Sequence, residues 1–121
     1  MHTTRALVVD DSASTRAILQ RWLTHAGIPT ETAASVDEAQ AIFERDPPTV
    51  AVVDLSMPHR GGGELTLWIK AQYPACRVVM YSAKPDTDDF AKVRREMGVD
   101  VWLTKAGDPA AVIRAVRGEQ P

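Results

Sequence analysis

Four short runs of apolar, mostly β-branched residues recur along the chain, and polar functional groups lie at the end of each run. The runs occupy residues 7–9, 50–53, 78–81 and 101–103, and the polar residues at their ends are Asp10, Asp11, Asp54, Ser82 and Lys105. Each run has the length and composition of a strand that is buried on both faces of a parallel sheet. Because parallel strands end along one edge, we expect these polar side chains to gather there.

Segments with helical periodicity separate the strands, and a weaker strand is predicted at residues 30–33. Ser35 and Glu38 have the spacing of a capping box, and Asp108 precedes a proline at the first helical position of another helix. The glycines at residues 61–63 predict a flexible loop. The predicted helices cover residues 14–26, 36–45 and 65–73, a fourth that begins at Asp86 or Thr87 and ends before Gly98, and a fifth that begins at Pro109.

The alternation of strands and helices predicts parallel strands joined by right-handed crossovers, and hence a three-layer α/β sandwich. Five β–α repeats fit a flavodoxin-like (βα)5 fold, whose parallel five-stranded sheet has the order 2-1-3-4-5. In that order the first and third strands are neighbours, so Asp10, Asp11 and Asp54 are expected to meet. The 121 residues fit one domain, residues 1–121.

Composition excludes several classes of function. The formal net charge is -2 and no basic run occurs, so nothing predicts direct binding to nucleic acid. The longest apolar stretch is shorter than the ~20 residues needed to cross a bilayer, and no secretory segment begins the chain, which predicts a cytoplasmic protein. Cys76 is the only cysteine, so an intrachain disulfide and a cysteine-based metal site are excluded.

The three aspartates predict a site for a divalent cation. Carboxylates ~5 Å apart repel by about 3 kcal/mol per pair at an effective dielectric constant near 20, so the cluster needs a counterion. Oxygen ligands favour Mg²⁺ or Mn²⁺ over Zn²⁺. A metal beside a carboxylate, with an amine and a hydroxyl nearby, suits the transfer of a phosphoryl group to aspartate. Asp54 ends the buried central run and is the predicted nucleophile, whereas Asp10 and Asp11 suit metal binding.

At this point the chain resembles the receiver domain of bacterial response regulators, the phosphorylated proteins of two-component signalling, with single receivers of the chemotaxis type as the nearest kind. The resemblance covers essentially the whole chain, and four motifs in order at the right spacing make it specific. The matching segments are residues 8–12 with Arg16 after them, residues 53–58 with Gly62, residues 79–83 and residues 103–105.

The resemblance implies a role for each site residue. Asp54 would receive the phosphoryl group from a phosphohistidine of a sensor histidine kinase or phosphotransfer protein. Mg²⁺ would be held by Asp11, Asp54 and the backbone carbonyl of Ser56, and by Asp10 mostly through water. Lys105 and Ser82 would contact the phosphoryl oxygens, and Ser82 would be the switch hydroxyl.

The resemblance also implies what phosphorylation does. The surface of the fourth helix, fifth strand and fifth helix would change its affinity for a downstream protein, and receivers often form homodimers through the same face. Such a chain is not an enzyme in the usual sense, because it catalyses only its own phosphorylation and dephosphorylation. Trp102 stands where the family usually has Tyr or Phe, so it belongs to the predicted switch, and its position predicts a surface reporter or partner contact.

Two other functions remain open at this stage. Trp102, and Ala106 where the family commonly has proline, favour a receiver-like interaction module that does not respond to phosphate. A phosphatase of the haloacid dehalogenase type also uses an aspartyl nucleophile, but it needs Asp-x-Asp and a cap domain, whereas Asp10 and Asp11 are adjacent. The sequence does not identify the kinase, the signal or the target, nor whether this receiver is complete or part of a larger regulator.

Overall fold

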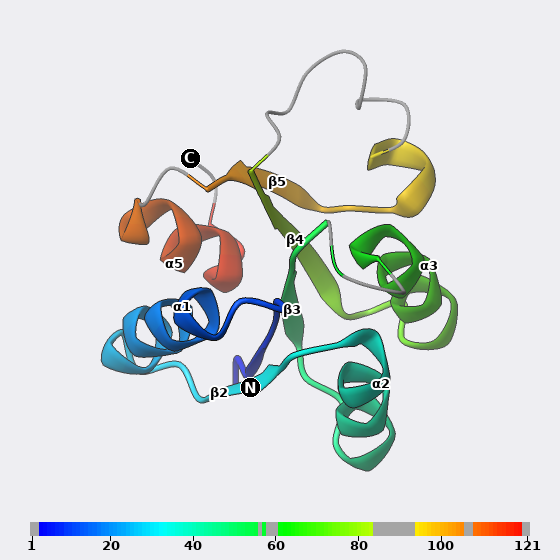
Figure 1. Cartoon of the computed structure of the whole chain (residues 1–121), viewed down its shortest axis with the longest axis horizontal. Coiled ribbons are helices and arrows are strands. Elements are labelled where there is room, and N and C mark those ends of the chain that lie inside the picture. Colours follow the sequence, from blue (N-terminus) through cyan, green and yellow to red (C-terminus); the bar gives the residue numbers. More distant parts are fainter. Residues whose placement is uncertain (1–2, 56, 58–60, 84–93, 106–107, 120–121) are drawn as a thin grey trace.

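A computed structural model shows a five-stranded sheet covered by helices on both faces (Figure 1) and describes residues 3–55, 57, 61–83, 94–105 and 108–119. All neighbouring strands are parallel, and their order is β2-β1-β3-β4-β5, which confirms the predicted flavodoxin-like topology. The strands are β1 (Ala6–Val9), β2 (Thr30–Ala33), β3 (Val50–Val53), β4 (Arg77–Ser82) and β5 (Val101–Thr104).

The helices form the two outer layers of the predicted sandwich. Helices α1 and α5 cover one face of the sheet, and α2 and α3 cover the other (Figure 1). Residues 94–97 are also helical and precede β5. The labelled helices are α1 (Ala13–His25), α2 (Val36–Arg45), α3 (Gly62–Gln72) and α5 (Pro109–Arg117).

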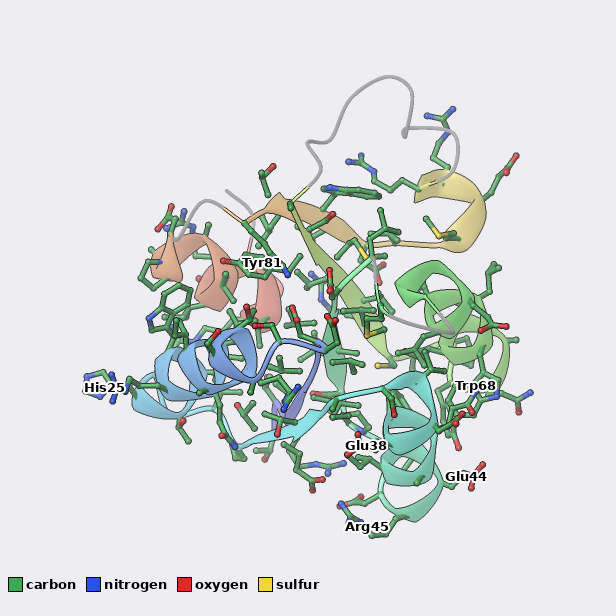
Figure 2. The ribbon with its side chains drawn as sticks, viewed as in Figure 1. His25, Glu38, Glu44, Arg45, Trp68 and Tyr81 are labelled. Carbon is green, nitrogen blue, oxygen red and sulfur yellow. The ribbon has the colours of Figure 1, made fainter. Side chains whose placement is uncertain are left out.

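Alternating side chains of the buried strands supply both halves of the core. In β1, Leu7 and Val9 pack with the α2 and α3 side, whereas Ala6 and Val8 pack with the α1 and α5 side. Figure 2 shows Trp68 of α3 on the side of α2, where its ring lies 5.7 Å from the ring of Phe43. Every residue of β1 and β3 is buried, as expected for strands covered on both faces.

Three helix starts follow from side-chain caps. Ser12, Ser35 and Asp108 accept hydrogen bonds from backbone N–H groups in the first turns of α1, α2 and α5, respectively. The predicted bounds of β2 and α2 and the predicted start of α5 are confirmed. Helix α1 begins one residue earlier than predicted, and it ends at His25 before Gly27, which has a φ of 85°.

The loop predicted at residues 61–63 is wrong for Gly62 and Gly63, which form the first turn of α3. A Cβ atom at Gly62 would lie 2.0 Å from the carbonyl oxygen of Asp54. The lack of a side chain therefore lets this helix start directly against the end of β3. At Gly62 the requirement for close packing outweighs the tendency of glycine to destabilise a helix.

The fourth predicted helix is described only at its end. Asp86 and Thr87, its predicted start, lie outside the described residues. Residues 94–97 are helical, and the predicted stop at Gly98 is confirmed by its φ of 83°. Among the described residues, no helix is long and apolar enough to cross a bilayer.

Candidate functional site

The pairing of β1 with β3 brings the distant aspartates together. Val9 is opposite Val53 in the register, and the backbone N–H of Asp54 donates a hydrogen bond to the carbonyl of Val9 at 2.9 Å. Asp10 and Asp54 therefore leave the sheet side by side at its carboxyl edge. The meeting predicted from the strand order is confirmed.

The three carboxylates form a compact acidic cluster. One oxygen atom from each of Asp10, Asp11 and Asp54 lies within 4.8 Å of the other two. Asp10 is 2% exposed and Asp54 is 7% exposed, whereas Asp11 is open to solvent. An all-oxygen donor set with one open side fits a hard divalent cation that keeps part of its water shell, so the residues present are suited to Mg²⁺.

Asp10 is held at all four of its polar atoms. Its N–H donates to the carbonyl of Ala33 in β2 at 3.1 Å, and its carbonyl oxygen accepts from Nη1 of Arg16 in α1 at 2.7 Å. Its carboxylate accepts from the N–H of Ser12 at 2.9 Å and from the ammonium of Lys105 at 2.9 Å. Asp10 is thus held by three segments of the chain: β2, the start of α1 and Lys105.

Lys105 provides the positive charge at the site. Its Nζ atom lies 3.5 Å from Oδ1 of Asp54, and its own backbone N–H donates to the carbonyl of Ser82 at 2.8 Å. Burial by itself would lower the pKa of this ammonium, but the hydrogen bond to Asp10 and the charges of Asp10 and Asp54 outweigh burial and raise the pKa. Lys105 therefore stays charged beside the predicted phosphorylation site.

Ser82 lies at the same edge of the sheet. It ends β4, is 2% exposed, and is opposite Thr104 of β5 in the register. Its neighbour Tyr81 lies on the side of the sheet covered by α1 and α5 (Figure 2). The placement of Ser82 next to β3 and β5 agrees with the sequence prediction, and its role as switch hydroxyl stays a prediction.

Trp102 lies in the core, and the surface position expected for it is wrong. Trp102 is 7% exposed and lies opposite Met80 in the strand register. It belongs to the same apolar cluster as Met97. The alternation of side chains along β5 directs this ring to the face covered by α2 and α3, where burial of a large apolar ring is favourable. Its predicted role in switching is not tested by this placement.

Two predicted features lie outside the described residues, namely the carbonyl of Ser56 as a metal ligand and the backbone at Ala106. Conversely, the contact of Arg16 with Asp10 was not predicted. Arg16 follows Asp11 by five residues in the sequence. This spacing identifies a motif but does not indicate which group the guanidinium contacts. A signal did exist, because an arginine in the first turn of a helix opposes the helix dipole and so needs another partner.

Comparison with known proteins agrees with this geometry. The chain is 31% identical over 117 residues to the probable transcriptional regulator ycf27 of Porphyridium aerugineum. The aligned region covers 97% of this chain and 48% of that protein. The chain thus spans about half the length of this curated relative.

Two solved structures are similar over nearly their whole length. The chemotaxis protein CheY4 of Vibrio cholerae has 26% identity and a TM-score of 0.89, with 98% of this chain and 100% of that chain covered. A response regulator receiver protein from Pseudomonas putida has 28% identity and a TM-score of 0.86, with 98% and 99% covered. The family model of the response regulator receiver domain matches residues 6–117. On fold, acidic cluster and sequence, this chain belongs to the response regulator receiver domain family.

Proposed function

We propose that this receiver domain is a phosphorylatable switch in which Asp54 accepts a phosphoryl group from the phosphohistidine of a sensor histidine kinase or a phosphotransfer protein. The observation that carries the proposal is the acidic cluster, in which carboxylate oxygens of Asp10, Asp11 and Asp54 lie within 4.8 Å of one another with Lys105 beside them. Three carboxylates beside one ammonium leave the site net negative, a repulsion that a bound cation relieves.

The chemistry assigns a separate role to each group. An oxygen of the Asp54 carboxylate attacks phosphorus while the bond from phosphorus to the donor nitrogen breaks, and the imidazole leaves with the electron pair. Lys105 stabilises the negative charge on the phosphoryl oxygens. Asp11, Asp54 and the Ser56 carbonyl, and Asp10 mostly through water, would hold Mg²⁺, which would supply further charge neutralisation; Mn²⁺ would suit the same ligands.

Ser82 is the group that reports phosphorylation in this proposal. Ser82 ends β4, the strand that pairs with β3, and Asp54 directly follows β3. Movement of Ser82 towards the phosphoryl group, accompanied by Trp102, changes the surface formed by residues 94–97, β5 and α5. A change of 1–3 kcal/mol in partner affinity is the usual scale of such coupling.

The proposed setting follows from this role. The domain acts in the cytoplasm and meets its kinase and a downstream protein. It can form homodimers through the face of the fourth and fifth helices, and it has no direct contact with nucleic acid or membrane. Its only catalysis is its own phosphorylation and dephosphorylation.

Phosphorylation is tested directly by mass spectrometry after incubation with Mg²⁺ and a small acyl phosphate, or by binding of beryllofluoride. We expect a gain of one phosphoryl group in a peptide that contains Asp54, and no gain with Asp54→Asn or without Mg²⁺. The control Asp37→Asn changes an exposed aspartate of α2 and should leave the gain unchanged.

A wild-type chain that shows neither a mass gain nor beryllofluoride binding would favour the interaction module that ignores phosphate. If phosphorylation is confirmed, phosphotransfer from individual sensor histidine kinases of the source cell identifies the cognate kinase, since the physiological donor transfers fastest.

A further inference from the structure

The contact between Arg16 and Asp10 has no role in the mechanism above. Nη1 of Arg16 donates to the backbone carbonyl of Asp10 at 2.7 Å, and the residue is partly buried. This carbonyl lies just past the last residue of β1, where the chain leaves the sheet. The guanidinium therefore holds the peptide group that joins Asp10 to Asp11.

Asp11 depends on that peptide for its position. Its carboxylate is exposed, and none of the described residues forms a hydrogen bond or ion pair with it. The buried carboxylate of Asp10, in contrast, is held by Ser12 and Lys105. Among the described residues, only the backbone therefore constrains where the Asp11 carboxylate lies, and the guanidinium of Arg16 holds that backbone from α1.

The location of Arg16 is unfavourable by charge. It lies in the first turn of α1, where the helix dipole disfavours a cation, and this turn contains no acidic residue. Its positive charge also opposes the approach of Mg²⁺ to the acidic cluster. An electrostatic role and a geometric role therefore predict opposite effects on metal affinity when Arg16 is replaced.

We propose that Arg16 is a positioning residue for the metal site, which aims Asp11 by holding the Asp10–Asp11 peptide. The inference rests on the metal binding in the proposed function. Its geometric effect outweighs the repulsion between the guanidinium and the cation, so loss of Arg16 weakens Mg²⁺ binding although it removes a positive charge.

The test is the Kd for Mg²⁺, measured by isothermal titration calorimetry at fixed ionic strength without any phosphodonor. Replacement of a residue that orients a metal ligand typically costs 10- to 100-fold in affinity, and we expect about 10-fold for Arg16→Met. The matched control is Arg21→Met, an exposed arginine on the same helix, which should leave the Kd unchanged.

Arg16→Lys separates geometry from charge. It keeps the charge but lacks the planar fork of the guanidinium, so we expect a Kd between those of wild type and Arg16→Met. This variant also carries the test if Arg16→Met does not fold, as judged by thermal unfolding without Mg²⁺.

Unchanged or tighter Mg²⁺ binding in Arg16→Met would overturn the positioning role. If Arg16→Met does not fold, a wild-type Kd in Arg16→Lys would overturn it. Neither result would contradict the proposed function. A wild-type chain that binds no Mg²⁺ would reject both proposals, and so the two failures are distinguishable.

Discussion

The ammonium of Lys105 hydrogen-bonds the carboxylate of Asp10 at 2.9 Å, although 95 positions separate the two residues in the sequence. Asp10 is 2% exposed, so this lysine is the counterion of a buried charge. The same ammonium lies 3.5 Å from Asp54. Without a bound metal, Lys105 thus offsets part of the repulsion within the acidic cluster.

Lys105→Met should therefore destabilise the metal-free protein and make it more responsive to Mg²⁺. Leaving Asp10 buried without its partner should lower the free energy of unfolding by about 1–3 kcal/mol, measured by urea denaturation in EDTA. Mg²⁺ should restore part of the loss, because it binds more tightly once the competing ammonium is gone.

Lys70→Met is the matched control for this prediction. Lys70 forms an ion pair with Asp100 at 2.7 Å, away from the acidic cluster. Its replacement should also reduce stability, but Mg²⁺ should stabilise this variant only as much as it stabilises wild type, so the difference between the two stays the same. Equal responses of the two variants to Mg²⁺ would show that Lys105 does not compete with the metal.

Gly62→Ala should disrupt the start of α3. The added Cβ would lie 2.0 Å from the carbonyl oxygen of Asp54 and 2.9 Å from Cγ1 of Val53. Backbone cannot move aside as a flexible side chain does, so we expect a loss of about 3 kcal/mol or more in the free energy of unfolding. The measurement is urea denaturation followed by circular dichroism.

Gly63→Ala serves as the control for the adjacent position. Its Cβ would lie 2.8 Å from Sδ of Met97, the end of a flexible side chain that can shift. Alanine also favours the helix by up to about 1 kcal/mol over glycine. We expect a change within about 1 kcal/mol, and a loss as large as that of Gly62→Ala would contradict the close-packing argument.

The contrast between these glycines shows where sequence reasoning succeeds and where it stops. Strands β1 and β3 and the cap of α2 could be predicted, because apolar runs and capping residues act over a few neighbouring positions. The strand order followed from the element count. Gly62 could not be assigned to a helix, because its role depends on the Asp54 carbonyl, a contact across a turn that no local pattern encodes.

The same limit applies to the site. Asp10, Asp11, Asp54, Ser82 and Lys105 were predictable because parallel strands end at one edge. The partner of Arg16 was not, because an arginine in the first turn of a helix predicts that a partner exists without identifying it, and here the partner is a backbone carbonyl. The face on which Trp102 lies depends on the exact register of β5, where a shift of one residue reverses every side chain.

Trp102→Ala tests the buried position of this ring. Replacement of a buried tryptophan by alanine typically costs 3–5 kcal/mol, and we expect a loss of about that size in the free energy of unfolding. Trp102→Phe keeps an aromatic ring among the same neighbours and should cost less. A loss below about 1 kcal/mol for Trp102→Ala would instead place the ring at the surface.

Cys76 gives the domain a dependence of stability on alkaline pH. Burial raises the pKa of its thiol from 9.0 to about 11; the nearby charge of Lys70 opposes this shift, and that of Asp100 adds to it. The unfolded thiol ionises near 9, whereas the folded thiol keeps its proton up to about 11. The free energy of unfolding should therefore be unaffected by this group below pH 9 and should fall between pH 9 and 11.

Two pKa units correspond to about 3 kcal/mol, so the fall should be measurable by urea denaturation at several pH values under reducing conditions. Cys76→Ala should lose this part of the pH dependence. Both proteins should keep a second fall in stability above pH 10.5, which comes from the raised pKa of Lys105. The difference between the two curves thus isolates the thiol. If wild type and Cys76→Ala give parallel curves from pH 8 to 11, the thiol ionises equally in both states, and burial of Cys76 in the core cluster does not suppress its ionisation.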